Sequence, residues 1–84
     1  MNSGSDNKIL TFELSADGDY IDVHMNRQGL EDLVLYLTRL RDSSELPTHD
    51  HLMTNSWAGT ELTEEAQGAD AKLINQVNLR LWPD

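Results

Sequence analysis

The sequence contains no cysteine, and this absence excludes several kinds of site. Without thiols the chain has no disulfide framework, no thiolate zinc site, no iron–sulfur cluster and no cysteine nucleophile. No apolar run approaches the ~20 residues that span a bilayer, and the sequence does not open with a basic segment followed by an apolar one. We therefore expect a soluble protein of the reducing cytoplasm.

Basic residues are also scarce. Six lysines and arginines stand against fifteen acidic residues, which gives a formal net charge of −9 and a pI near 4.5. Nucleic acid and anionic membranes would repel such a chain, so neither is expected as a partner. The charge favours a basic partner, although the same acidity would also keep an inert small protein in solution.

The length of 84 residues leaves room for one hydrophobic core. We predict a polar, disordered tail over residues 1–7 and a single domain over residues 8–84. A deep substrate cleft would remove much of so thin a core, and no glycine-rich phosphate loop or activated nucleophile is recognisable. The sequence therefore predicts a protein that is not an enzyme and needs no cofactor.

Hydrophobic periodicity predicts the first half of the fold. Apolar and polar residues alternate over residues 8–15 and 20–25, and Asp17-Gly18 between them favours a tight hairpin turn. Asn26 is a suitable helix cap, and apolar residues then recur at helical spacing. These are Leu30, Leu33, Val34, Leu37 and Leu40.

The second half has one strong signal and a long irregular stretch. Residues 49–54 are predicted as a short strand, and residues 55–71 as an ordered loop anchored by Trp57 and Leu62. Residues 72–82 alternate throughout and predict a central strand. The order β-β-α-β-β predicts a two-layer α+β fold, with one amphipathic helix on one face of a four-stranded, largely antiparallel sheet.

Three histidines are the only residues with a pattern that could bind a metal. In a strand His49 and His51 project to one side, and His24 could lie across the sheet from them. Three imidazoles could form an open zinc site, but none of the usual HxxxH or HExxH spacings is present. Exposed or hydrogen-bonding histidines are the simpler interpretation, so no metal is predicted and the site is kept as an alternative.

A tryptophan among small and acidic residues is the better candidate for a binding site. Trp57 lies in the sequence Asn-Ser-Trp-Ala-Gly, and a buried tryptophan often dominates the affinity of an interface. Neighbouring carboxylates would speed encounter with a basic partner. The predicted partner-binding residues are Trp57, Glu61, Glu64, Glu65 and Asp50.

Several segments resemble the immunity protein 32 family, whose members are small proteins of bacterial polymorphic toxin systems. The resemblance covers roughly residues 20–82. It is carried by His-Leu-Met-Thr-Asn-Ser-Trp-Ala-Gly at residues 51–59, Glu-Leu-Thr-Glu-Glu at 61–65, Leu-Ile-Asn-Gln-Val at 73–77 and the final Leu81-Trp82. The family usually has a second glycine where this chain has Ala58, and often histidine where it has Gln76.

The resemblance implies an immunity protein that binds a cognate toxin domain and blocks it. Many such toxins are nucleases with basic clefts, which an acidic protein could fill as a charge mimic. The alternatives are a histidine-based metal-binding protein or small metal-dependent enzyme, and a module that assembles with copies of itself through an uncovered sheet edge.

Overall fold

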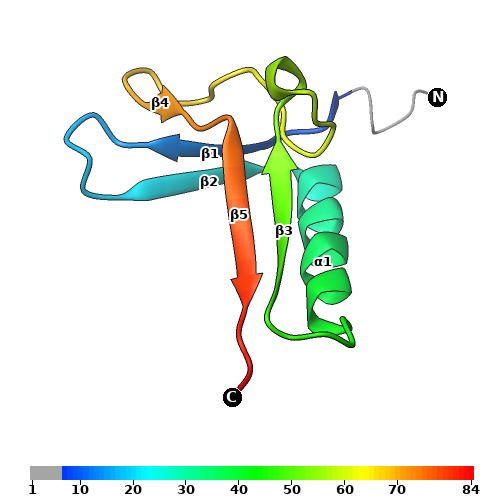
Figure 1. Ribbon diagram of the computed structural model, residues 1–84. Coiled ribbons are helices and arrows are strands. Elements are labelled where there is room, and N and C mark those ends of the chain that lie inside the picture. The colour runs from blue at the N-terminus through cyan, green and yellow to red at the C-terminus, as the bar shows by residue number, and fades with distance from the viewer. Residues whose placement is uncertain (1–6) are drawn as a thin grey trace.

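A computed structural model describes residues 7–84, which form five β-strands and one α-helix (Figure 1). The α+β class, with one helix and antiparallel strands, is confirmed. The bounds are β1 (Leu10–Leu14), β2 (Ile21–Met25), α1 (Arg27–Arg41), β3 (Thr48–Met53), β4 (Lys72–Leu73) and β5 (Gln76–Leu81), with a short 3-10 turn at Asn55–Trp57.

The first sheet, called sheet A, has the strand order β2-β1-β4. The predicted hairpin joins β1 to β2 in antiparallel register, with Phe12 opposite Val23. Its turn contains Gly18 at a φ of +78°, a conformation that favours glycine. The short strand β4 pairs with the other side of β1, so β1 is central and β2 is an edge.

The second sheet, sheet B, consists of β3 and β5 paired antiparallel. The sequence predicted one four-stranded sheet, and the strands instead divide between two sheets that cross each other in Figure 1. The predicted strand over residues 72–82 is divided at Ile74 and Asn75. There the Ile74 amide donates to Phe12 in sheet A, whereas the Asn75 carbonyl accepts from Thr54 at the end of β3. One stretch of chain thereby serves both sheets.

Helix α1 begins as predicted at Asn26, whose side-chain oxygen accepts hydrogen bonds from the Gly29 amide at 2.9 Å and the Ile9 amide at 3.0 Å. The helix lies so close to the chain before β1 that a Cβ atom on Gly29 would stand 1.7 Å from the Ile9 carbonyl oxygen. Glycine at this position is a packing requirement, because any other side chain would force the helix away.

The core lies where the two sheets and the helix meet. Within residues 7–84 its fully buried apolar side chains are Leu10, Leu52 and Leu62, with Phe12, Leu33, Tyr36, Val77 and Leu79 packed against them. The predicted apolar stripe of the helix is only partly used, because Leu30, Val34 and Leu37 are exposed. Much of the apolar surface is therefore left uncovered.

Two further predictions concern the N-terminal tail and the lack of a membrane-spanning segment. Residues 1–6 of the predicted tail lie outside the described residues, and Asn7 accepts a hydrogen bond from the Asn26 side chain at 2.6 Å. In the part of the chain that the structure describes, no helix has the length and apolar character needed to cross a membrane.

Candidate functional site

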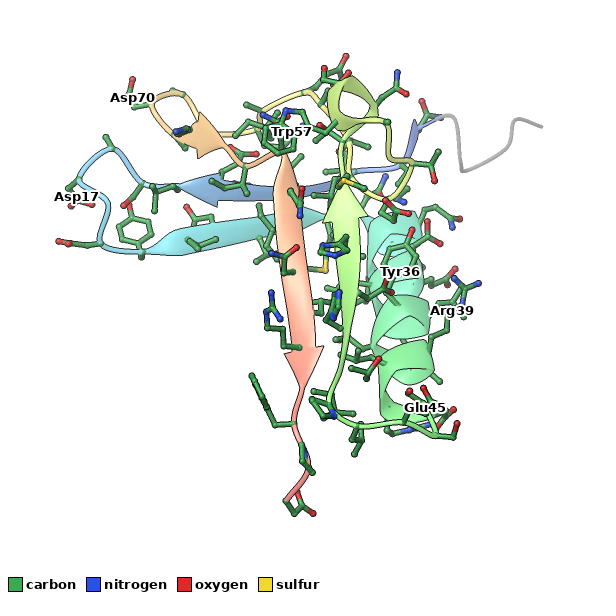
Figure 2. All side chains as sticks on the ribbon, viewed as in Figure 1. Asp17, Tyr36, Arg39, Glu45, Trp57 and Asp70 are labelled. Carbon is green, nitrogen blue, oxygen red and sulfur yellow. The ribbon has the colours of Figure 1, made fainter. Side chains whose placement is uncertain are left out.

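Trp57 lies on a tight turn that directly follows β3, beside the start of β5 (Figure 2). Three backbone hydrogen bonds of 2.9 Å close the turn: the Trp57 and Gly59 amides donate to the Thr54 carbonyl, and the Ala58 amide donates to Asn55. Thr54 itself is fully buried. The indole, by contrast, is 53% exposed, so a rigid turn holds a large aromatic side chain at the surface.

Two of the predicted binding residues stabilise this turn through hydrogen bonds to backbone amides. The Glu61 carboxylate accepts from the amides of Met53 at 3.1 Å and Thr60 at 3.3 Å, and the Glu64 carboxylate accepts from the Ser56 amide at 2.6 Å. Gly59 lies against Met53, where a Cβ atom would come within 2.5 Å of the Met53 Cβ. The carboxylates therefore fix the conformation of the turn as well as adding charge near it.

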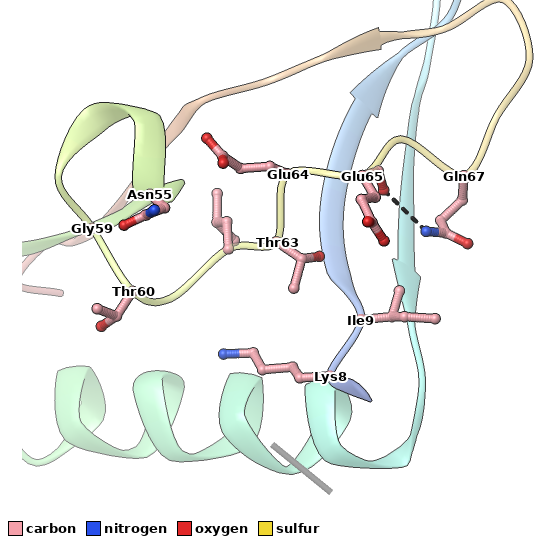
Figure 3. A pocket seen from close by; sticks show the side chains of 10 residues that line it. Lys8, Ile9, Asn55, Gly59, Thr60, Thr63, Glu64, Glu65 and Gln67 are labelled. Atoms are coloured by element: carbon pink, nitrogen blue, oxygen red, sulfur yellow. Dashed lines mark hydrogen bonds between the residues drawn. The ribbon is translucent and has the colours of Figure 1, made fainter. Parts of the chain in front are cut away.

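A surface hollow lies on each side of the turn. The larger, of about 540 Å³, is enclosed by Lys8 and Ile9 on one side and by residues of the 55–67 segment on the other (Figure 3). Glu64 and Glu65 lie on its wall. The second hollow, of about 500 Å³, is lined by Trp57 and by residues 72–76 and Asn78. A partner that covers Trp57 can thus also fill depressions next to it.

The lysine in the larger hollow is not available to balance these carboxylates. The Lys8 ammonium lies 2.9 Å from the Asp32 carboxylate and donates to the Tyr36 hydroxyl at 3.3 Å. Burial alone would lower the pKa of Lys8, but its hydrogen bonds to Asp32 and Tyr36 outweigh that effect and raise the pKa. Because Lys8 is already paired with Asp32, the hollow keeps an acidic wall.

The segment that carries Glu64 and Glu65 is anchored to β1 by a buried carboxylate. Glu13 is 0% exposed, and it accepts hydrogen bonds from the Gln67 and Gly68 amides at 2.9 Å and from the Thr11 hydroxyl at 2.6 Å. Burial alone would raise the pKa of the Glu13 carboxyl. These hydrogen bonds, together with nearby His24, outweigh burial and hold that pKa below its usual value.

Sequence reasoning missed the role of Glu13. The alternation of residues 8–15 placed Thr11 and Glu13 on the polar side of a half-buried strand, yet both side chains are fully buried. The 62–70 segment covers that side: Thr63 exchanges hydrogen bonds with Leu10, and Gln67 and Gly68 bind Glu13. Periodicity shows which residues share a face but not what covers that face, and no other signal in the sequence identified the contact.

The predicted binding residues do not all meet. Trp57, Glu61, Glu64 and Glu65 lie in one continuous segment around the turn. Asp50 lies within β3 opposite Leu79, on the side of the strand that carries Leu52, and its carboxylate accepts from the His51 amide. Asp50 therefore belongs to sheet B and not to the surface around Trp57.

The three histidines occupy two different sheets. His49 and His51 do share a side of β3, with ring centroids 4.8 Å apart. The ring of His51 is engaged by the side chains of Gln76 and Asn78. His24 lies in β2, 3.9 Å from the Glu13 carboxylate. Among the described residues no group of three or more histidine and acidic side chains could hold a metal ion.

Comparisons with models of known protein families, with curated proteins and with solved structures find no match to this chain. Membership of the immunity protein 32 family therefore stays a prediction from the sequence.

Proposed function

We propose that this protein is an immunity protein, which neutralises a bacterial toxin domain by covering a basic surface of it with the turn that carries Trp57. The observation that carries the proposal is an exposed indole on a turn fixed by two carboxylates. The family resemblance of residues 51–59 supports the same segment.

A fixed turn favours tight binding because little conformational entropy is lost when the partner docks. Trp57 is immobilised at its backbone by the Thr54 carbonyl and through its neighbour Ser56 by Glu64. Tryptophan residues in such positions often contribute most of the affinity once they are desolvated in a complementary pocket. Trp57 would be the anchor of the interface.

Charge would select the partner. Glu64 and Glu65 line the hollow beside the turn, the paired Lys8 leaves them unopposed there, and the whole chain carries a net charge of −9. Such a surface attracts a basic protein over long distances and repels nucleic acid. A nuclease domain with a phosphate-binding cleft has the matching charge.

Calorimetric titration against the C-terminal domain of a toxin-like protein encoded beside this one tests the proposal. We expect nanomolar affinity that weakens as salt is added, because charge attraction between exposed groups is screened. Trp57→Ala should weaken binding by about 30-fold or more, which corresponds to about 2 kcal/mol.

Trp82 provides the matched control. It follows β5 at the end of the strand that points away from the Trp57 turn, and it is 65% exposed. Trp82→Ala should leave the affinity unchanged. Equal losses from both substitutions would remove the turn from the interface, and no binding to a folded toxin domain would overturn the proposed function.

A further inference from the structure

Several large apolar side chains are also exposed away from the Trp57 turn. On β2 the side chains of Ile21, Val23 and Met25 stand opposite Leu14, Phe12 and Leu10 of β1, and so face the core side of sheet A. Even so, Ile21 is 55% exposed and the other two are more than a third exposed. Nothing within the described chain covers the outer half of this face.

Helix α1, which directly follows β2 in the chain, carries exposed apolar side chains as well. It begins directly after Asn26, and its exposed residues Leu30, Val34 and Leu37 recur at helical spacing beside Leu33, which packs on the core. We call the six exposed residues the open apolar face: Ile21, Val23, Met25, Leu30, Val34 and Leu37. Each of the six is more than a third exposed, and a dimer interface of standard size, about 800 Å² from each partner, would remove such side chains from water.

Strand β2 also has a free edge next to this face. The Ser15 amide donates to the Tyr20 carbonyl, and the Asn26 amide donates to the Ile9 carbonyl. In an antiparallel pair, hydrogen-bonded residues alternate with residues whose backbone groups point to the other side, so the even-numbered residues of β2 are the ones bonded to β1. The backbone groups of Ile21, Val23 and Met25 therefore point away from β1. The strand contains no lysine, proline or bulge of the kind that protects natural sheet edges from pairing.

The sequence of β2 is complementary to itself. In an antiparallel pair of two β2 strands centred on Val23, each Ile21 stands opposite a Met25 on the apolar side. Each Asp22 then stands opposite a His24 on the polar side, where an acid meets a hydrogen-bond donor. A pair centred on Asp22 would bring the two Asp22 carboxylates together, and a pair centred on His24 would place Asp22 opposite Asn26, outside the strand. Within the strand, the register about Val23 is the one that pairs each acid with a histidine and each Ile21 with a Met25.

Other elements lie next to the free edge of β2. In Figure 1, α1, β3 and β5 all extend beyond β2 on the side away from β1. A second copy joined at that edge would approach these elements, so that both β2 and α1 would lie at the interface. The exposed apolar residues of both elements would be buried in one step.

We propose that a second copy of this chain covers the open apolar face, in a two-fold dimer that joins the two β2 strands edge to edge about Val23. Each copy presents its Trp57 turn outside the dimer interface. The proposal is independent of the toxin-binding function, since it concerns a different surface and a different partner.

Single cysteines test the register directly because the natural chain has no cysteine. Residues paired about the two-fold axis have Cα atoms about 5.5 Å apart, within the range of a disulfide. Val23→Cys should therefore form a covalent dimer under mild oxidation. Ile21→Cys should not, because its own counterpart lies about 13 Å away along the strand. The reverse result, or equal crosslinking of both variants, would overturn the register.

Sedimentation of the unmodified chain tests the dimer itself. We expect twice the monomer mass of 9.5 kDa at micromolar concentration. Val34→Lys should shift the protein to monomer, whereas Leu35→Lys, an equally simple change on another side of the same helix, should leave the dimer intact. Circular dichroism would show whether both variants fold. A natural chain that sediments as a monomer throughout would overturn the proposal.

Discussion

The carboxylate of Glu13 accepts a hydrogen bond from the backbone amide of Gly68 at 2.9 Å, across 55 positions of the sequence. The same carboxylate holds Gln67 and Thr11. One buried acid on the central strand thereby fixes the segment in which Glu64 and Glu65 line the hollow beside Trp57.

Replacement of Glu13 by alanine should destabilise the protein strongly. The substitution leaves the Thr11 hydroxyl and two backbone amides without their partner in a buried place, so we expect a loss of about 3 kcal/mol or more in the free energy of unfolding. Urea denaturation measures the loss. Glu65→Ala is the control, with a change within about 0.5 kcal/mol, since its side chain is exposed. A Glu13 variant as stable as this control would contradict the anchoring role.

Acid should weaken the same anchor. The pKa of Glu13 is lower in the folded protein than its ordinary value of 4.5. The stabilisation from its ionised form is therefore complete above pH 4.5 and is lost as the pH falls through the folded value. Glu13→Gln removes this ionisation, so its unfolding free energy should fall less than that of the natural protein between about pH 5 and pH 3. Parallel pH profiles for the two proteins would contradict the lowered pKa.

Gly29 should tolerate no side chain. Its Cβ atom would overlap the Ile9 carbonyl, so Gly29→Ala should cost more than about 3 kcal/mol, although alanine is the better helix former. Gly18→Ala is the informative comparison. Gly18 has a φ of +78° but open space around it, and there the cost should be only about 1 kcal/mol of backbone strain. Urea midpoints of the two variants test this order, and a reversed order would rule out the close contact of α1 with residue 9.

At Ala58 we expect glycine to be more stable than the natural residue. It adopts a φ of +70°, which disfavours any residue with a Cβ atom. Ala58→Gly should therefore stabilise the protein by about 0.5–1 kcal/mol while the Trp57 turn keeps its shape. Thermal unfolding provides the measurement. Ala66→Gly, at a position without a positive φ, should give a small loss, and a gain there as well would point to a cause other than backbone strain.

The sequence predicted those parts of the fold that local chemistry determines. The hairpin around Gly18, the start of α1 at Asn26 and the antiparallel strands were all recognisable from turn residues, capping and alternation. The division of residues 72–82 between two sheets was not, because both halves keep the period of a strand. It depends on Asn75 meeting Thr54, a contact between distant parts of the chain.

For the candidate site, the sequence predicted which residues to consider but not the contacts that they make. Trp57 and the acidic residues after it were proposed as binding residues from the sequence around them. The structure places them around one turn, and their role in binding stays a prediction. The bracing roles of Glu61 and Glu64 could not be predicted, because a carboxylate that binds backbone amides has the same sequence signal as one that is merely solvated. The packing role of Gly29 could not be predicted for a related reason: the chain segment that it touches lies twenty positions earlier.

The sharing of residues 72–81 between both sheets also sets an order of events during synthesis on the ribosome. The β1–β2 hairpin and α1 can form once residue 41 has emerged, because the hydrogen bonds that pair β1 with β2 and those within the helix all lie upstream of that point. Strand β3 then has no partner until β5 follows, so its backbone groups stay unpaired while the intervening segment is translated. A nascent chain that has emerged from the ribosome beyond residue 54 but not beyond residue 76 would therefore expose β3 without its partner strand. In this state chaperones and proteases could bind the unpaired strand.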